Sequence, residues 1–305
     1  MTRRSIIAAW LICMTMVVSL TCWNVDSPPS RPLDLPDGVL RMTVLELPSH
    51  GLAIVLRTPS NRCYLIDAGE KADGTNAGRD VIAPFLRARG ISRIDGMLIS
   101  HPDRDHFEGA KHLLKNFGVG AVWDAGFDRK RLPRSYVRFQ ELAKTRSQLT
   151  SLRDGDPLDW GPDLEISVLA PPSGGVASLE KDFDNDNSIV LKIRHGEVTF
   201  LVPGDLETNG CRSLLRLHGG SLNSSVLLAP HHGFLNSPEF ARAVSARDVI
   251  VSCDRFYADK KIQSPGEFST KLYGAFGAKV HVTSWHGNIQ VASDGTRCEV
   301  TREHE

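Results

Sequence analysis

The hydrophobic positions of the chain fall into two successions of short apolar segments, and each succession also contains amphipathic stretches. In the first, strands are predicted at residues 39–46, 52–57, 63–66, 94–99 and 121–122, with helices at residues 78–89 and 110–116. In the second, strands are predicted at residues 164–169, 189–193, 198–202, 226–228, 249–252, 280–283 and 288–291, with helices at residues 206–217, 237–245 and 265–276. This order predicts an α/β protein with two similar halves.

Polar clusters that suit metal ions directly follow four of these predicted strands. They are Asp67, the segment His101–His106, Asp205, and the pair His231 and His232. Taken singly, each has an ordinary interpretation, since Asp-x-Gly and Gly-Asp are common turns and paired histidines can be core or surface residues. However, loops at strand ends converge on one rim in α/β folds, and imidazole and carboxylate groups bind divalent cations. The combination therefore predicts a metal centre.

The motifs themselves carry a resemblance to a known family. The order D-x-G, H-x-D-x-D-H, G-D and H-H-G resembles the metallo-β-lactamase fold superfamily, whose usual second motif is H-x-H-x-D-H. Aspartate at position 103, D-N-S-I-V-L at residues 186–191 and P-H-H-G at residues 230–233 are similar to a narrower group, the hydrolase domain of ComEC-type competence (DNA-uptake) proteins. The similarity covers about residues 40–297. It implies an α/β fold, a four-layer αββα sandwich, in a single domain over residues 39–301.

The resemblance also implies a set of metal ligands. One ion would bind His101 and Asp103. The other would bind Asp105, His106 and a histidine of the 231–232 pair, taken as His231, with Asp205 bridging the two ions. The superfamily usually provides a third histidine for the first ion, but the matching region here contains only Asp186, Asn187 and Ser188. The oxygen-rich first site makes Mn²⁺ an alternative to Zn²⁺ and leaves open whether one or two divalent ions bind.

Further roles follow from the same resemblance. Asp105, Asp205 and His232 are the expected catalytic residues, which orient or deprotonate the attacking water and donate to the leaving group. Asp67, Asn187 and Ser188 are expected to hold the ligands in place. The nucleophile would be a metal-bound hydroxide, and the chain has no Ser-His-Asp signature that would supply a covalent intermediate.

Charge limits the range of partners. Lys plus Arg and Asp plus Glu both number 36, so the net charge is zero and gives no global attraction to nucleic acid. A local basic segment, residues 129–146, has seven basic residues and a single acid, with Tyr136 and Phe139 interleaved. It is either a surface that contacts single- or double-stranded DNA or a solvated helix face with its aromatic residues packed inward. The candidate substrate contacts are Arg129, Lys130, Arg131, Arg134 and Phe234.

The N-terminus has the features of an export signal. Arg3 and Arg4 precede an uncharged apolar run over residues 6–20, so residues 1–25 are predicted to be a signal peptide or a membrane anchor. Residues 26–38 are predicted to be a Pro-rich linker. The expected location is periplasmic, extracellular or anchored to the outer side of the inner membrane, with membrane contact only through this segment. The pattern makes no prediction about oligomeric state.

Together these features predict an exported metal-dependent hydrolase that acts on phosphodiester bonds, as a nuclease. Two alternatives stay open. One is a hydrolase of another small ester, lactone, thioester or lactam, and the other is a catalytically weakened DNA-binding module. The four cysteines beyond the signal lack C-x-x-C spacing and can be buried thiols or disulfides: Cys63, Cys211, Cys253 and Cys298.

Overall fold

The computed structural model describes residues 38–127, 132–235, 237–254 and 264–305. The predicted signal, the linker up to residue 37 and three predicted substrate contacts (Arg129, Lys130 and Arg131) lie outside these ranges. Among the described residues, no helix has both the length and the apolar character needed to cross a membrane.

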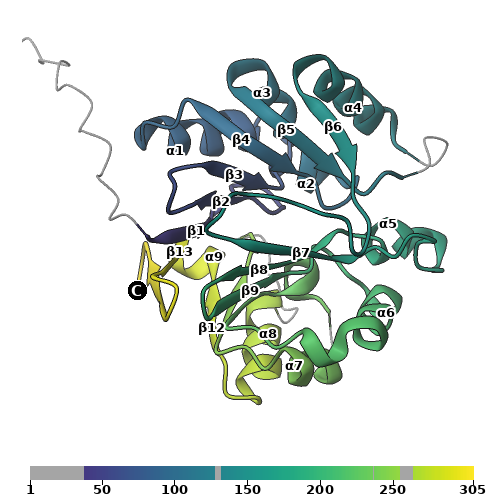
Figure 1. The fold of residues 1–305 in the computed structure, drawn as a ribbon, viewed down its shortest axis with the longest axis vertical. Coiled ribbons are helices and arrows are strands. Elements are labelled where there is room, and N and C mark those ends of the chain that lie inside the picture. Colours follow the sequence, from purple (N-terminus) through teal and green to yellow (C-terminus); the bar gives the residue numbers. More distant parts are fainter. Residues whose placement is uncertain (1–37, 128–131, 236, 255–263) are drawn as a thin grey trace, which may run out of the picture.

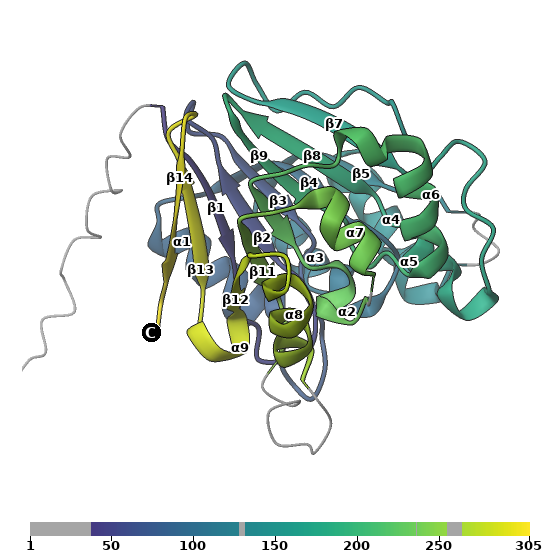
Figure 2. The ribbon, with the colours of Figure 1, turned by 90° about the horizontal axis from the view of Figure 1, so that it is seen from below.

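Two β-sheets pack face to face, and helices cover both outer sides (Figures 1 and 2). The eight-stranded sheet comprises, in spatial order, β14 (Cys298–Arg302), β13 (Ile289–Ser293), β1 (Leu40–Val44), β2 (Ile54–Arg57), β3 (Cys63–Ile66), β4 (Arg93–Leu98), β5 (Gly118–Asp124) and β6 (Gln148–Ser151). The six-stranded sheet comprises β12 (Lys279–Val282), β11 (Asp248–Val251), β10 (Val226–Leu228), β9 (Val198–Val202), β8 (Val190–His195) and β7 (Glu165–Ala170).

The helices divide between the two outer faces. The eight-stranded sheet is covered by α1 (Ala83–Ala88), α2 (Arg104–Phe107), α3 (Ala110–Asn116) and α4 (Arg134–Arg146). The six-stranded sheet is covered by α6 (Thr208–His218), α7 (Pro238–Val244) and α8 (Pro265–Gly274), while the short helices α5 (Phe183–Asp186) and α9 (Thr283–His286) lie in connections. This arrangement confirms the predicted four-layer αββα sandwich.

Central strands are apolar throughout because both of their faces are buried. In β2, Ile54 and Leu56 point into the core between the sheets, whereas Val55 points to the core under the helices. Phe200 of β9 lies in the same inter-sheet core, and Leu201 packs toward the outer helices. Strands buried on both faces appear in a sequence as continuous apolar runs, which is why they were readily predicted.

Two edge strands were not predicted, and both are polar. In β6, Gln148, Thr150 and Ser151 are exposed. In β14, every residue is exposed or only half-buried. An edge strand facing solvent needs no apolar alternation, so it leaves no periodic signal in the sequence. β14 ends at Arg302, one residue beyond the predicted domain.

The basic segment after β5 is largely a helix with its aromatic residues inside. Tyr136 and Phe139 of α4 are fully buried, and both rings pack against Phe107, with centroids 4.8 and 5.7 Å away. They therefore serve the core and offer no stacking surface. Arg134, at the start of α4, is exposed.

All four cysteines of the described part are free thiols, and Cys298 alone among them is only half-buried. Burial raises the pKa of Cys63 to about 12 and that of Cys211 to about 11. Of the two interpretations of these residues, the structure supports buried, unreactive thiols.

Two leucines of α6 provide a matched test of the packing. Leu214 is 1% exposed and Leu217 is 46% exposed, although they lie less than one turn apart. Leu214→Ala is expected to lower the free energy of unfolding by about 2–5 kcal/mol, because it leaves a cavity beneath the six-stranded sheet. Leu217→Ala should change it by no more than about 0.5 kcal/mol. Urea denaturation measures both, and equal effects would contradict the packing described here.

Candidate metal centre

Strand ends of both sheets meet at one edge of the sandwich. His101 follows β4, and the segment after it carries Asp105 and His106 on the short helix α2. From the other sheet, Asp205 follows β9 and His232 follows β10. The predicted convergence of strand-end side chains is therefore present, with contributions from both sheets.

Four side chains form the centre of this group: Asp105, His106, Asp205 and His232. Asp205 Oδ2 lies 3.2 Å from Nε2 of both His106 and His232, and these two nitrogens are 3.3 Å apart. Asp105 Oδ2 lies 3.3 Å from His232 Nε2 and 3.6 Å from His106 Nε2. One ligand atom of each residue lies within 4.8 Å of all the others, as binding to one cation requires.

Hydrogen bonds orient both imidazoles of this group. His232 donates from Nδ1 to the carbonyl of Ser252 at 2.9 Å, and His106 Nδ1 contacts Asp67 Oδ2 at 2.8 Å. A histidine that donates from Nδ1 presents the lone pair of Nε2 toward the centre, which is the arrangement that a metal ligand needs.

Asp67 lies beneath the centre as a fully buried anchor. Its Oδ1 accepts from the Ser100 backbone amide at 2.7 Å, and its Oδ2 accepts from the Ser100 hydroxyl at 2.7 Å. With the contact to His106, one carboxylate therefore ties the end of β3 to the ligand segment after β4. This geometry fits the predicted positioning role of Asp67.

A second part of the group surrounds His101 and has fewer donors. His101 Nε2 is 3.5 Å from Asp103 Oδ2 and 4.0 Å from Asp205 Oδ2, and it is buried without a hydrogen-bond partner. The side chain of Asp103 is 45% exposed. A buried, unpartnered imidazole nitrogen beside two carboxylates fits a cation, and one of these carboxylates, Asp205, is shared with the central group.

The segment in which the superfamily usually has a third histidine, residues 186–188, makes hydrogen bonds within the protein. Asp186 accepts from the Gly210 backbone amide at 2.6 Å and from the Ser178 hydroxyl. The Asn187 side chain bonds to both backbone groups of Val176. Ser188 Oγ accepts from the Asp205 backbone amide at 3.2 Å, so Ser188 positions a central residue, whereas Asn187 fastens a neighbouring loop.

The two histidines after β10 have different environments, and the predicted ligand, His231, is not in the central group. Both residues have a left-handed backbone, with φ of 47° and 54°, so their side chains diverge. His231 Nδ1 lies 2.6 Å from Glu207 Oε1, and its Nε2 is 4.0 Å from Asp205 Oδ2. His232, predicted as a catalytic donor, takes the central place instead. Phe234 is 41% exposed, with its ring centroid 5.7 Å from that of His231.

His50 and Asp254 also reach the site, although the sequence reading did not select them. His50 lies on the β1–β2 connection, with its ring centroid 4.4 Å from that of His232 and its Nε2 3.7 Å from Asp105 Oδ2. Its Nδ1 lies 3.4 Å from Asp254 Oδ2. The adjacent Gly51 allows this approach, since a Cβ there would lie 2.2 Å from the Asp105 carbonyl. The pair His50-Gly51 between two strands was the available signal.

Opposite charges stabilise one another in the buried group. Burial disfavours the imidazolium of His106, but the surrounding carboxylates, Asp205 foremost, raise its pKa well above the usual value. Burial also disfavours the imidazolium of His232, but Asp205 and Asp105 raise its pKa to about 10. Burial would raise the pKa of Asp205, yet the two histidines hold it well below the usual range. Without a metal, protons supply the positive charge that these carboxylates require, and a divalent cation fits the same place.

Comparisons with known proteins agree with this geometry. A family model described as the metallo-beta-lactamase superfamily matches residues 47–238. Competence protein ComA of Neisseria gonorrhoeae is 33% identical over 294 residues, which cover 94% of this chain and 38% of that protein. ComE operon protein 3 of Bacillus subtilis (strain 168) is 28% identical over 224 residues, covering 72% of this chain and 27% of that protein. The chain thus spans well under half the length of these curated relatives.

Solved structures share the fold at low sequence identity. The metallo-beta-lactamase fold protein YhfI from Bacillus subtilis aligns with a TM-score of 0.55 at 13% identity, covering 86% of this chain and 100% of that one. CmlA, a diiron beta-hydroxylase from Streptomyces venezuelae, aligns with a TM-score of 0.51 at 15% identity, covering 85% and 54%. At these identities the likeness concerns the fold alone.

The neighbouring histidines allow a matched test of the ligand set. His232→Ala is expected to abolish tight binding of Zn²⁺ or Mn²⁺, because it removes one of the four central ligand atoms. His231→Ala should retain the ion, since its ring contacts Glu207 instead. Elemental analysis after dialysis gives the metal content of each variant. Loss of the ion in His231→Ala, with retention in His232→Ala, would restore the ligand assignment made from sequence.

Asp67→Asn tests the anchor beneath the centre. The amide keeps the size of the side chain but weakens the grip on His106, so metal affinity should fall by about 10–100-fold. Isothermal titration with Zn²⁺ measures this, and Asp80→Asn, at an exposed position, is the control. An unchanged affinity in Asp67→Asn would show that Asp67 has no part in orienting the ligand.

Proposed function

Because the chain belongs to the metallo-beta-lactamase superfamily, we propose that it is a metal-dependent hydrolase that cleaves phosphodiester bonds of DNA. One observation carries this proposal: imidazole and carboxylate ligand atoms from both sheets gather within 4.8 Å of one another at the edge of the sandwich. The cofactor would be one or two divalent ions, Zn²⁺ or Mn²⁺. The ions would be held by Asp105, His106, Asp205 and His232, with His101 and Asp103 alongside.

Two lines support a phosphodiester substrate. Relatives of this chain bear names that refer to competence and recombination, among them Recombination protein 2 of Haemophilus influenzae, which is 24% identical over 73% of this chain. The resemblance seen in the motifs points to proteins of DNA uptake. Since the chain spans only a part of these relatives, their substrates are proposed here for the matching domain alone. Arg134, which is exposed, remains a candidate contact, and export through residues 1–25 is proposed with the same function.

The reaction would divide between the ions and the protein. Bound divalent ions supply acidity to water and neutralise charge on the oxygen under attack. Asp105 and Asp205 are placed to orient the attacking water and hold its proton. His232 points Nε2 into the ligand group, so it is not free to contact a leaving group. We therefore assign that contact to the neighbouring His231, whose Nδ1 lies 2.6 Å from Glu207 Oε1 and is positioned by it. Phe234, exposed next to His231, would contact the substrate.

A second candidate function, DNA binding without cleavage, is favoured by one observation. The part of the centre around His101 has only Asp103 and the shared Asp205 near its Nε2 within the described chain. A centre that retains a single ion could bind a DNA strand and leave it intact. The two functions respond differently to loss of a central ligand.

His106→Ala separates them. With Mn²⁺ or Zn²⁺, the purified protein is expected to cleave single-stranded DNA. His106→Ala should cleave it more than about 100-fold more slowly, because loss of a residue that only orients a metal ligand already lowers activity by about 10–100-fold. His112→Ala, on the outer helix α3, is the control. Gel analysis of labelled DNA measures the rate. Absence of cleavage in the wild-type protein, with DNA affinity unchanged in His106→Ala, would favour the binding module. Turnover of a lactam, lactone or thioester instead would replace the phosphodiester substrate.

A further inference from the structure

A groove with two arginines lies on the six-stranded half, and no residue of the ligand group lines it. It has a volume of about 490 Å³ and runs between the loop at residues 172–177 and helix α6. Arg212 and Arg216 line it, together with the polar side chains of Asn209 and Ser213. Figure 1 shows α6 beside α5 on the same side of the molecule. No aspartate or glutamate of the described residues lines this groove.

Among the described residues, the two arginines have no partner that would account for them. Both are exposed, and four positions separate them, so they lie one turn apart on the same helix face. Neither forms an ion pair or a side-chain hydrogen bond with any residue in the described ranges. Like charges at this spacing destabilise a helix, and a polyanion in the groove would reverse that effect.

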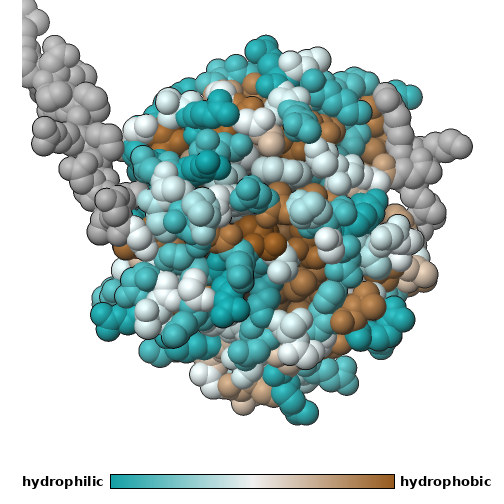
Figure 3. All heavy atoms as spheres, in the orientation of Figure 1, coloured by the Kyte–Doolittle hydropathy of each residue, from teal (hydrophilic) through white to brown (hydrophobic). Residues whose placement is uncertain are grey.

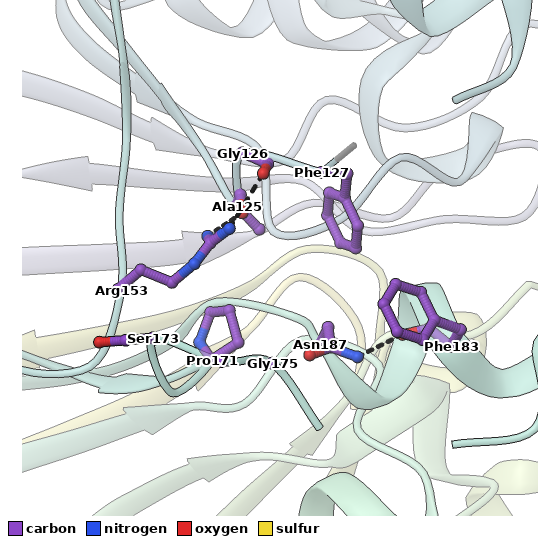
Figure 4. Close-up of a pocket in the computed structure, with 10 residues that line it drawn as sticks. Ala125, Gly126, Phe127, Arg153, Pro171, Ser173, Gly175, Phe183 and Asn187 are labelled. Carbon is purple, nitrogen blue, oxygen red and sulfur yellow. Dashed lines mark hydrogen bonds between the residues drawn. The ribbon is translucent and has the colours of Figure 1, made fainter. Parts of the chain in front are cut away.

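An aromatic cavity adjoins the groove (Figure 4). It has a volume of about 160 Å³, and Gly175 lines both it and the groove. The rings of Phe127 and Phe183 meet there, with centroids 6.4 Å apart. Arg153, the one charged residue that lines the cavity in the described structure, bonds to the carbonyls of Ala125 and Gly126 and so has a structural role.

Both depressions are connected to the ligand group through short stretches of chain. Helix α6 begins at Thr208, three residues after Asp205, and carries the arginines along its axis. The four-residue spacing of Arg212 and Arg216 is about 6 Å of helix rise, comparable to the separation of successive phosphates in an extended strand. Asn187 lines the cavity, and the next residue, Ser188, supports Asp205. The cavity and the groove are therefore linked to the ligand group by a few residues of chain.

Figure 3 shows an apolar area in the middle of the face seen in Figure 1, between the half that carries α1, α3 and α4 and the half that carries α6, α7 and α8. Single-stranded nucleic acid combines a charged backbone with exposed planar bases, and proteins bind it by pairing cationic grooves with aromatic side chains.

We propose that single-stranded DNA runs from the ligand group past Phe127 and Phe183 into the groove, where Arg212 and Arg216 bind its phosphates. This rests on the proposed phosphodiesterase function and names the form of its substrate. Base stacking would use Phe127 and Phe183, in place of the buried Tyr136 and Phe139 of the basic segment. Duplex DNA, whose bases are already paired and stacked, would gain only the phosphate contacts.

Fluorescence anisotropy with a labelled single-stranded oligonucleotide in EDTA measures binding separately from cleavage. Arg212→Glu with Arg216→Glu should weaken binding by at least about tenfold at low salt and lower the salt dependence by about 1.4 in the log–log slope, for two lost phosphate contacts. Phe183→Leu, which keeps an apolar side chain, should weaken it by at least about fivefold. Lys115→Glu with Lys279→Glu, an equal charge change at exposed sites elsewhere, is the control.

The outcomes separate this inference from the function on which it rests. Unchanged affinity and salt slope in the arginine variant, an equal loss in the lysine control, or no binding by the wild-type protein would each overturn the groove assignment. Tighter binding of duplex DNA or of RNA than of single-stranded DNA would overturn the substrate assignment. If the wild-type protein binds through the arginines yet cleaves nothing with Mn²⁺ or Zn²⁺, the groove stands and the hydrolase function fails. Thermal melting by circular dichroism confirms that each variant is folded.

Discussion

The structure depends on a balance of buried charge at the joint between its two sheets. Asp105 and Asp205 come from different sheets and are held within 3.6 Å of the imidazoles of His106 and His232. Buried carboxylates are costly unless a positive charge lies beside them. Protons on the histidines meet this need in the protein alone, and a divalent cation bound by the same four residues would also meet it. The two sheets must therefore align closely at this edge, which is also where the chemistry is proposed to occur.

Several features outside the ligand group maintain that alignment. Asp67 links β3 to the ligand segment, Ser252 fixes the His232 ring, and Ser188 supports Asp205 from the amino end of β8. Close backbone approaches are equally important, since a side chain at Gly109 would meet the carbonyl of Ala68 at 2.0 Å. Such contacts explain how loops, which are usually mobile, can hold several ligand atoms in a fixed arrangement.

Much of the fold and the outline of the site could be predicted because they depend on local patterns. Strands buried on both faces are continuous apolar runs, and the candidate metal ligands follow their ends. The presence of His232 rather than His231 in the four-residue group could not be foreseen, because it depends on a left-handed backbone that orients adjacent rings differently. His50 enters the site from a distant connection, where the pair His50-Gly51 is a weaker signal than the motifs at the strand ends. Of the two interpretations left open for residues 129–146, the structure supports the helix whose aromatic residues pack inward, since Tyr136 and Phe139 are core residues.

X-ray absorption spectroscopy of the protein loaded with one equivalent of Zn²⁺ tests the central assignment most directly, because it reports the atoms that contact the ion. The four-residue group predicts two imidazole nitrogens, from His106 and His232, with all remaining contacts from oxygen. A spectrum with sulfur contacts, or with one imidazole or none, would contradict a metal centre formed by Asp105, His106, Asp205 and His232.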